Sequence, residues 1–217
     1  MPFTDACLKE LASIGGNPLI AGLIMPCGTS SWSLDEEPFF QVWDTVAEAN
    51  LPVMLHPALE QSPIAFHRWT LGSSMAVPME TSLAAMHLIL SGVLDRLPQL
   101  KIVVPHLGGV LPYLSQRLVE KGHGDAKEDV DHYLRNRLYY DSNSYHEPAL
   151  KCAIKTVGAD RIMLGSDYPF RGELGRCVDD ILGASIEDRE RNLILAGTAR
   201  SVMRNLGSFR GGSDVEI

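Results

Sequence analysis

The sequence predicts an α/β fold in which a parallel β-sheet is covered by helices. Short apolar runs recur along the chain, and each is followed by a segment with helical periodicity. A continuous apolar run is typical of a strand that is buried on both faces of a parallel sheet. The alternation repeats about five times without a Gly-x-Gly-x-x-Gly fingerprint. It fits either a doubly wound open sheet or a (β/α)8 barrel, and in both the chemistry lies at the carboxyl ends of the strands.

The elements can be assigned in order from apolar runs, caps and turn residues. Strands are expected at residues 19–24, 52–57, 100–106, 138–141 and 162–164. Helices are expected at residues 5–13, from the capping box Ser33-x-x-Glu36 to Asn50, from Pro78, after Gly108-Gly109, at 148–157, from Val178 and at 186–206. The helix from Pro78 is expected to bury Leu83, Met86, Leu90 and Val93, while residues 60–76 and 121–131 are expected to be loops.

The composition indicates one domain over residues 1–206, followed by a disordered Gly/Ser-rich tail at 207–217. The 217-residue chain has a formal net charge of -8 and no cluster of Lys and Arg, which argues against a nucleic-acid partner. No apolar run approaches the length of a membrane span, so no membrane partner is expected. The four cysteines form no Cys-x-x-Cys pair, which favours free thiols and a soluble, cytoplasmic protein.

Three polar side chains share one position, at or just past the end of an apolar strand: His56, His106 and Asp167. Because parallel strands end at the same edge of a sheet, we expect these side chains to lie on one face. Neutral imidazole and carboxylate are good ligands for zinc and similar divalent ions. Taken singly, each histidine reads as a satisfied core or loop residue and Asp167 as a loop cap. The three matching positions favour a site.

The pair Gly108-Gly109 follows His106 and precedes a helix. Without side chains these residues would let a ligand approach free N–H groups, and the N-terminus of a helix favours an anion. A tight turn between strand and helix explains the same pair equally well. Both interpretations stay open at the level of the sequence.

Taken in order, these motifs resemble those of one protein family. They are His56-Pro57, the stretch Val104–Gly109 with Pro112 and Arg117, and the stretch Leu164–Phe170. Their order and spacing are similar to the aminocarboxymuconate-semialdehyde decarboxylase branch of the amidohydrolase superfamily, and the resemblance covers residues 2–206. It implies a metal-dependent (β/α)8 barrel.

The resemblance also implies roles for individual residues. His56 would be a metal ligand on strand five, His106 the acid/base residue on strand six, and Asp167 a metal ligand on strand eight. Arg117 matches an arginine that reaches a substrate carboxylate, in some members across a dimer interface, and Trp69 loosely matches a pocket aromatic. The implied cofactor is a divalent metal, zinc with manganese as the other candidate. The implied partners are a small carboxylate substrate and a second copy in a homodimer.

This sequence departs from the family on its first strand, where the family carries a His-x-His pair of metal ligands. No His-x-His occurs here. The chain therefore matches only strands four to eight with their helices, which predicts an incomplete barrel with exposed sheet edges.

The implied activity is a carboxy-lyase that acts on a small unsaturated or aromatic acid, using metal-activated water and His106 as acid/base. Hydrolysis of a lactone or amide by the same residues is an alternative. A third hypothesis, favoured by the missing pair, is a catalytically inactive domain that serves binding or oligomerisation.

Overall fold

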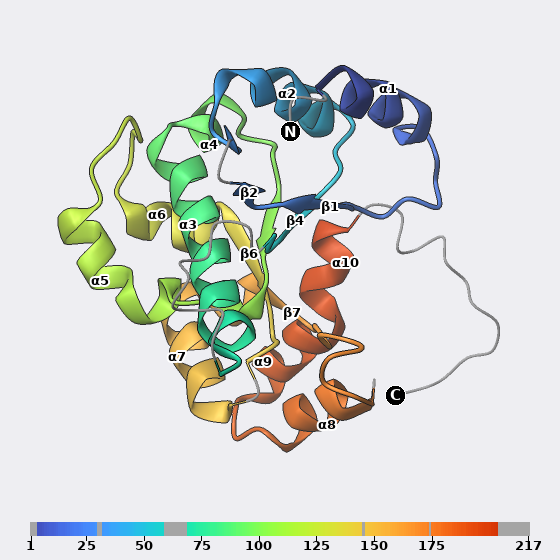
Figure 1. Cartoon of the computed structure of the whole chain (residues 1–217). Coiled ribbons are helices and arrows are strands. Elements are labelled where there is room, and N and C mark those ends of the chain that lie inside the picture. The colour runs from blue at the N-terminus through green and yellow to red at the C-terminus, as the bar shows by residue number, and fades with distance from the viewer. Residues whose placement is uncertain (1–3, 30–31, 59–68, 145, 174, 204–217) are drawn as a thin grey trace.

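Five parallel strands form the central sheet of the computed structural model, which describes residues 4–29, 32–58, 69–144, 146–173 and 175–203 (Figure 1). The strands are β1 (Leu23–Pro26), β4 (Val53–His56), β5 (Ile102–Val104), β6 (Leu138–Asp141) and β7 (Ile162–Met163). Each lies beside the next in chain order. A doubly wound sheet reverses its strand order at a switch point, whereas a barrel does not. The topology is therefore that of part of a barrel.

Helices connect successive strands, and Figure 1 shows α3, α5, α6 and α7 on one side of the sheet and α10 on the other. The helices are α1 (Thr4–Ile14), α2 (Phe40–Glu48), α3 (Val77–Leu90), α4 (Val93–Arg96), α5 (Leu111–Lys121), α6 (Val130–Asn136), α7 (Glu147–Val157), α8 (Gly175–Gly183), α9 (Asp188–Asn192) and α10 (Thr198–Val202). Short 3-10 turns span 37–39, 106–108 and 159–161, π-helical turns span 72–76 and 193–197, and β2 (Gly28–Thr29) pairs with β3 (Trp32–Ser33).

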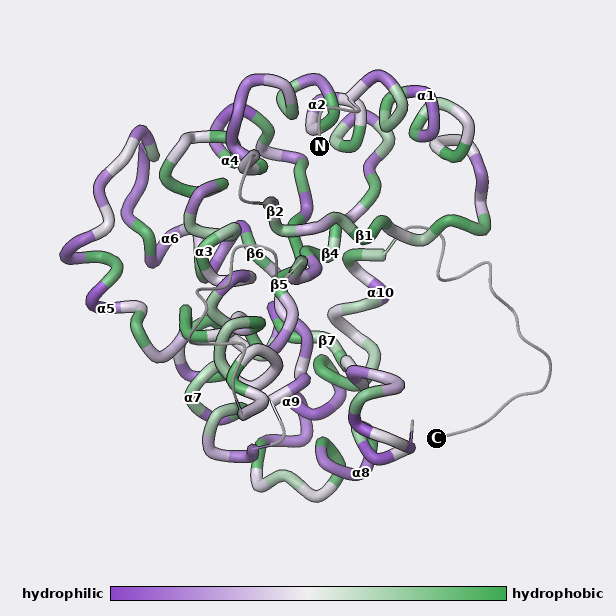
Figure 2. Tube along the Cα trace, in the orientation of Figure 1, coloured by the Kyte–Doolittle hydropathy of each residue, from purple (hydrophilic) through white to green (hydrophobic). Residues whose placement is uncertain are grey.

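The alternation of side chains along the strands divides the core into two parts. Ile102 and Val104 of β5 pack with the large core under the helices. Figure 2 shows hydrophobic colouring along stretches of the central strands and of α3. Val103, between them, packs on the opposite face with Met163 and with Val202 of α10. The last helix therefore covers apolar side chains on the face of the sheet that lies opposite the main helical layer.

The first strand is displaced from its predicted position. Residues 19–24 were expected to form it, but β1 starts at Leu23, where it pairs with Val53 of β4. Leu19 and Ile24 each expose 69% of their surface, so the apolar run that suggested the strand is not a buried one. Hydrogen bonding to β4, rather than burial, determines the position of β1, because the side chains of this edge strand are only partly buried or exposed.

Two helices differ from their predicted limits. The helix expected from Ser33 starts at Phe40 after a 3-10 turn, although the N–H of Ser33 does donate to Oε1 of Glu36 at 2.9 Å. The helix from Pro78 ends at Leu90, because Gly92 adopts φ +74° and separates it from α4, which contains Val93. The expected burial of Leu83 is wrong, since this side chain exposes 59% of its surface.

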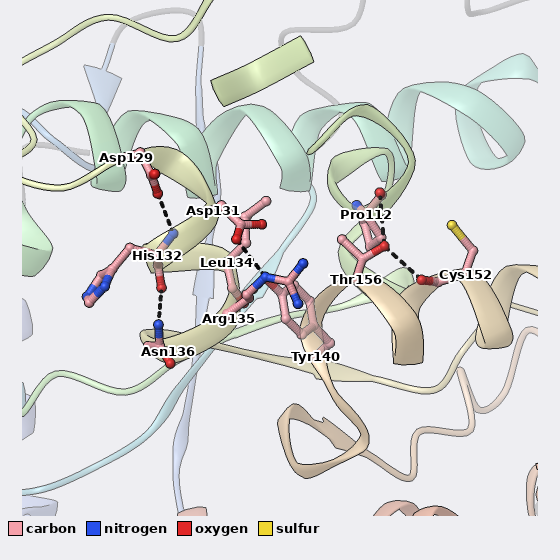
Figure 3. A network of polar contacts seen from close by, with 10 residues as sticks. All are labelled: Pro112, Asp129, Asp131, His132, Leu134, Arg135, Asn136, Tyr140, Cys152 and Thr156. Carbon is pink, nitrogen blue, oxygen red and sulfur yellow. Dashed lines mark hydrogen bonds and ion pairs between the residues drawn. The ribbon is translucent and has the colours of Figure 1, made fainter. Parts of the chain in front are cut away.

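A short helix, α6, begins within the segment that was expected to be a loop (Figure 3). The carboxylate of Asp129 caps it by accepting the N–H of His132, and Arg135 pairs with Asp131 at 2.6 Å. The hydroxyl of Tyr140 on β6 donates to the carbonyl of Leu134 at 2.8 Å. Burial of its apolar face, rather than a long periodic pattern, stabilises this helix.

The predicted tail at 207–217 lies outside the described residues. Across the described part of the chain, every helix is too short or too polar to cross a membrane.

Candidate active site

The structure places His56 and Asp167, two of the three predicted strand-end residues, within electrostatic reach of the third, His106. His56 ends β4, His106 follows β5 by two residues, and Asp167 lies in the connection after β7. Burial lowers the pKa of His106, the negative charge of Asp167 opposes that shift, and a positive charge on His56 adds to it. The balance leaves the His106 imidazole neutral at neutral pH, which is the form that can accept a proton.

His56 is held in the tautomer that leaves Nε2 as its possible metal-binding atom. Its ring Nδ1 lies 2.9 Å from the carbonyl oxygen of Pro57, which can only accept, so Nδ1 carries the hydrogen. The lone pair then resides on Nε2 of an exposed side chain. The N–H of Cys27, at the end of β1, donates to the backbone carbonyl of His56 and fixes the strand end.

His106 sits in an unusual turn in which four consecutive residues have positive φ: 56° at His106, 54° at Leu107, 78° at Gly108 and 60° at Gly109. Residues other than glycine avoid this region, so surrounding contacts must hold the first two. In the described part of the chain, the buried Nδ1 of His106 has no hydrogen-bond partner. Its other ring nitrogen, Nε2, is therefore the atom through which His106 can exchange protons.

The two glycines pack tightly in this turn. A Cβ on Gly108 would lie 2.8 Å from the ring of Tyr140, and one on Gly109 would lie 2.1 Å from the carbonyl oxygen of Pro78. Their N–H groups donate to Pro105 and His106 at 3.1 and 2.8 Å. The prediction that these N–H groups are free for a ligand is therefore wrong, and the tight-turn interpretation holds.

Asp141, the last residue of β6, is a fourth polar side chain at the strand ends, which the sequence pattern did not single out. It exposes only 6% of its surface. Burial raises its pKa to about 7, against the effect of hydrogen bonds from the N–H groups of Leu107 and Asn143. An aspartate followed by serine at a strand end has the pattern of an ordinary turn cap, so the sequence alone did not distinguish it.

Asp167 is partly buried and adopts φ +53°, while its carbonyl accepts the N–H of Phe170. Nearby, a cavity of about 290 Å³ is lined by residues that include Ser142, Gly165 and Arg171. Ser142 follows Asp141 directly, and Gly165 precedes Asp167 by two residues. The strand ends of β6 and β7 therefore border a space of the size of a small organic molecule.

The other two predicted site residues lie on the surface. Arg117 is exposed on α5, and Trp69 exposes 75% of its surface before the π-helical turn at 72–76. Neither is enclosed beside the strand-end residues.

The donor chemistry suits a divalent metal only in part. His56 and Asp167 offer an imidazole nitrogen and carboxylate oxygens, which bind zinc and manganese. Among the described residues, however, no three His, Cys, Asp or Glu side chains are grouped so that they could hold a metal. A bound metal would need ligands in addition to these two, as the missing His-x-His pair predicts.

Comparison with known proteins supplies the family. Residues 1–204 match the family model described as amidohydrolase. Over 217 aligned residues the chain is 29% identical to a gamma-resorcylate decarboxylase of Polaromonas sp. JS666, covering 92% of this chain and 64% of that protein. It is 28% identical to a 2-amino-3-carboxymuconate-6-semialdehyde decarboxylase of Dictyostelium discoideum, covering 92% of this chain and 57% of that protein.

A solved structure agrees with the sequence matches. The dihydroxybenzoic acid decarboxylase of Polaromonas sp. JS666, with bound manganese and the inhibitor 2-nitroresorcinol, superposes with a TM-score of 0.79 at 25% identity. The alignment covers 91% of this chain and 64% of that one. The predicted barrel-type fold and the predicted resemblance are thus confirmed, with about two thirds of the relatives' length represented. The chain belongs to the amidohydrolase family.

Proposed function

We propose that this chain forms the larger part of a metal-dependent decarboxylase that acts on a small aromatic carboxylic acid. The observation that carries the proposal is the placement of His56, His106 and Asp167 at or just after the carboxyl ends of β4, β5 and β7 in an amidohydrolase-type sheet, with His56 and Asp167 both acting electrostatically on His106. Two relatives that match 92% of the chain are named as decarboxylases of resorcylate and of aminocarboxymuconate semialdehyde, while another, which matches 93% of it, is named as a hydratase.

His106 is the proposed proton donor and acceptor. Loss of CO2 from an aromatic acid requires a proton at the ring carbon that bears the carboxylate, after which the C–C bond breaks and its electrons restore the ring. At neutral pH the neutral His106 first takes up a proton from solvent or from an acidic group of the substrate and then delivers it to the ring carbon. Because burial lowers the pKa of His106, the imidazolium so formed is a stronger acid than free imidazolium and gives up this proton readily. Nδ1 of His106 is buried, so we propose that the proton moves through Nε2 of the same ring.

His56 and Asp167 are the proposed metal-binding residues of this chain. A divalent metal bound there would supply Lewis-acid polarisation of substrate oxygen atoms. We propose manganese, since a related decarboxylase structure holds it, while zinc remains the alternative predicted from the sequence. Substrate orientation by Arg117 and Trp69, which are both exposed, fits a site that a second subunit closes.

A second candidate, an inactive domain used for binding or assembly, is favoured by one observation. The described residues lack a third metal-binding side chain near His56 and Asp167. The assay of CO2 release described next distinguishes decarboxylation from both an inactive domain and hydrolysis, because only decarboxylation releases CO2.

The test is release of CO2 from 2,6-dihydroxybenzoate and 5-carboxyvanillate by the full chain with manganese. The wild-type protein should release CO2, and His106→Ala should lower the rate by roughly 100-fold or more, the usual contribution of general acid–base catalysis. His132→Ala on α6, a histidine remote from the strand ends, is the matched control and should retain the wild-type rate. Absence of CO2 release, or equal rates for wild type and His106→Ala, would refute the proposal.

A further inference from the structure

The turn that carries His106 is fastened at both ends by side chains. At its far end, the hydroxyl oxygen of Ser82 accepts the N–H of Val110 at 2.9 Å, and its hydrogen is shared between the carbonyls of Pro78 at 2.7 Å and Gly108 at 3.2 Å. At its near end, Oδ1 of Asp141 accepts the N–H of Leu107 at 3.2 Å, and both of these residues are buried. The hydrogen bond that Asp141 accepts from Leu107 is therefore the one that lies directly beside His106 in the chain.

Asp141 is itself fixed in place. Its Oδ1 also accepts the N–H of Asn143 at 3.1 Å, two residues along the chain. On its other side lies Gly165, where an added Cβ would come within 2.7 Å of the Cβ and 2.9 Å of the Oδ2 of Asp141. The carboxyl group of Asp141 therefore packs between the turn after β5 and the segment after β7 that leads to Asp167.

We infer that Asp141 is a positioning residue that holds the left-handed turn at His106 and Leu107, and so orients the acid/base histidine. This inference rests on the proposed function, because it names what orients the residue that moves the proton. Two residues that are not glycine adopt positive φ here at a cost of about 1 kcal/mol or more each, so the turn needs such a fastening. Without the acceptor, the buried N–H of Leu107 would lose its partner and the turn would relax.

The chain offers a matched set of variants. Asp141→Asn keeps an oxygen that can accept both N–H groups, whereas Asp141→Ala removes it. Gly165→Ala leaves Asp141 unaltered but pushes its carboxylate away, and the backbone of Gly165 is outside the left-handed region, so its effect is steric. Gly175→Ala is the control, because a Cβ there meets nothing within 4 Å.

The first measurement is amide hydrogen exchange by NMR in the full chain. Exchange at Leu107 should accelerate roughly 10-fold or more in Asp141→Ala and Gly165→Ala, which corresponds to about 1.4 kcal/mol for the lost bond. It should stay near the wild-type rate in Asp141→Asn and Gly175→Ala. The amide of Val53, which donates to Lys101 within the sheet, reports that the core remains folded. If Asp141→Ala does not fold, Gly165→Ala tests the same contact.

The second measurement is steady-state decarboxylation. Asp141→Ala should lower kcat roughly 10-fold with KM nearly unchanged, and Asp141→Asn should restore kcat, because only orientation of the proton donor is affected. Wild-type exchange at Leu107 in Asp141→Ala, or an Asp141→Asn protein that behaves like Asp141→Ala, would overturn the inference. A wild-type protein without activity would refute the proposed function instead, and exchange at Leu107 would still decide the role of Asp141.

Discussion

At the scale of single residues, the chemistry of the site depends on how burial shifts proton affinity at the strand ends. His106 is partly buried and Asp141 is buried, and burial favours the neutral form of each, so it moves their pKa values in opposite directions. His56, His106 and Asp167 were proposed as a site because each lies at or shortly after the end of an apolar run. Asp141 also ends an apolar run, but an aspartate followed by serine there has the pattern of a turn cap, and its contact with the turn at Leu107 is visible only in the structure.

The raised pKa of Asp141 predicts a pH-dependent stability. The carboxyl is protonated in the folded protein up to about pH 7 but titrates near 3.8 when unfolded, so stability falls as pH rises between these values. We expect the free energy of unfolding to drop by roughly 2 to 3 kcal/mol more in wild type than in Asp141→Asn between pH 5 and pH 8. Urea unfolding at both pH values measures the difference. An equal pH dependence in the two proteins would show that Asp141 keeps its ordinary pKa.

At the scale of elements, periodicity predicted the positions of helices and strands whose side chains are well buried. Elements with little buried surface differ from their predicted positions. The strands β4 to β7 lie close to their predicted positions because their side chains are almost fully enclosed. The edge strand β1 and the short helix α6 differ because pairing with β4 and packing of Tyr133 and Leu134 determine them, and neither contact is visible in a local pattern.

The turn between β5 and α5 gives a prediction at this scale. Gly109→Ala places a Cβ 2.1 Å from the carbonyl oxygen of Pro78 and must adopt φ +60°. We expect it to lower the free energy of unfolding by roughly 3 kcal/mol or more, because strain and clash add. Gly183→Ala on α8, whose Cβ would meet nothing within 4 Å, is the control in the same urea titration. Equal stability of the two variants would contradict the close packing of this turn.

At the scale of the whole molecule, the structure is one arc of a barrel. Among the described residues β1 and β7 each pair with one strand only, and α10 covers part of the face opposite the main helices. The missing His-x-His pair predicted an incomplete barrel, and the chain spans 64% of the length of the gamma-resorcylate decarboxylase it matches. Apolar periodicity did not identify an exposed apolar stripe on α3, because Leu83, which belongs to it, was assigned to the core.

We expect that stripe to form part of the interface in the homodimer that the family resemblance implies. Met75, Met79 and Leu83 recur every four residues on π-helical turn 72–76 and α3, and all three are exposed. We expect Met79→Glu with Leu83→Glu to convert a dimer into a monomer in analytical ultracentrifugation, with little change in stability because these side chains are exposed. Ala12→Glu, exposed on α1, should leave the dimer intact. A monomeric wild-type protein, or a dimer in the double variant, would contradict this interface.

The measurement that tests the central claim most directly is the metal dependence of CO2 release by the full chain, with and without EDTA, for wild type and Asp167→Asn. Asp167→Asn keeps the size of the side chain but removes the carboxylate charge that attracts a divalent ion. We expect release of CO2 from 2,6-dihydroxybenzoate by the manganese-loaded wild type, its loss with EDTA, its recovery with added manganese, and little release by Asp167→Asn. Equal CO2 release by wild type in EDTA, or by Asp167→Asn with manganese, would contradict a metal-dependent decarboxylase site at these strand ends.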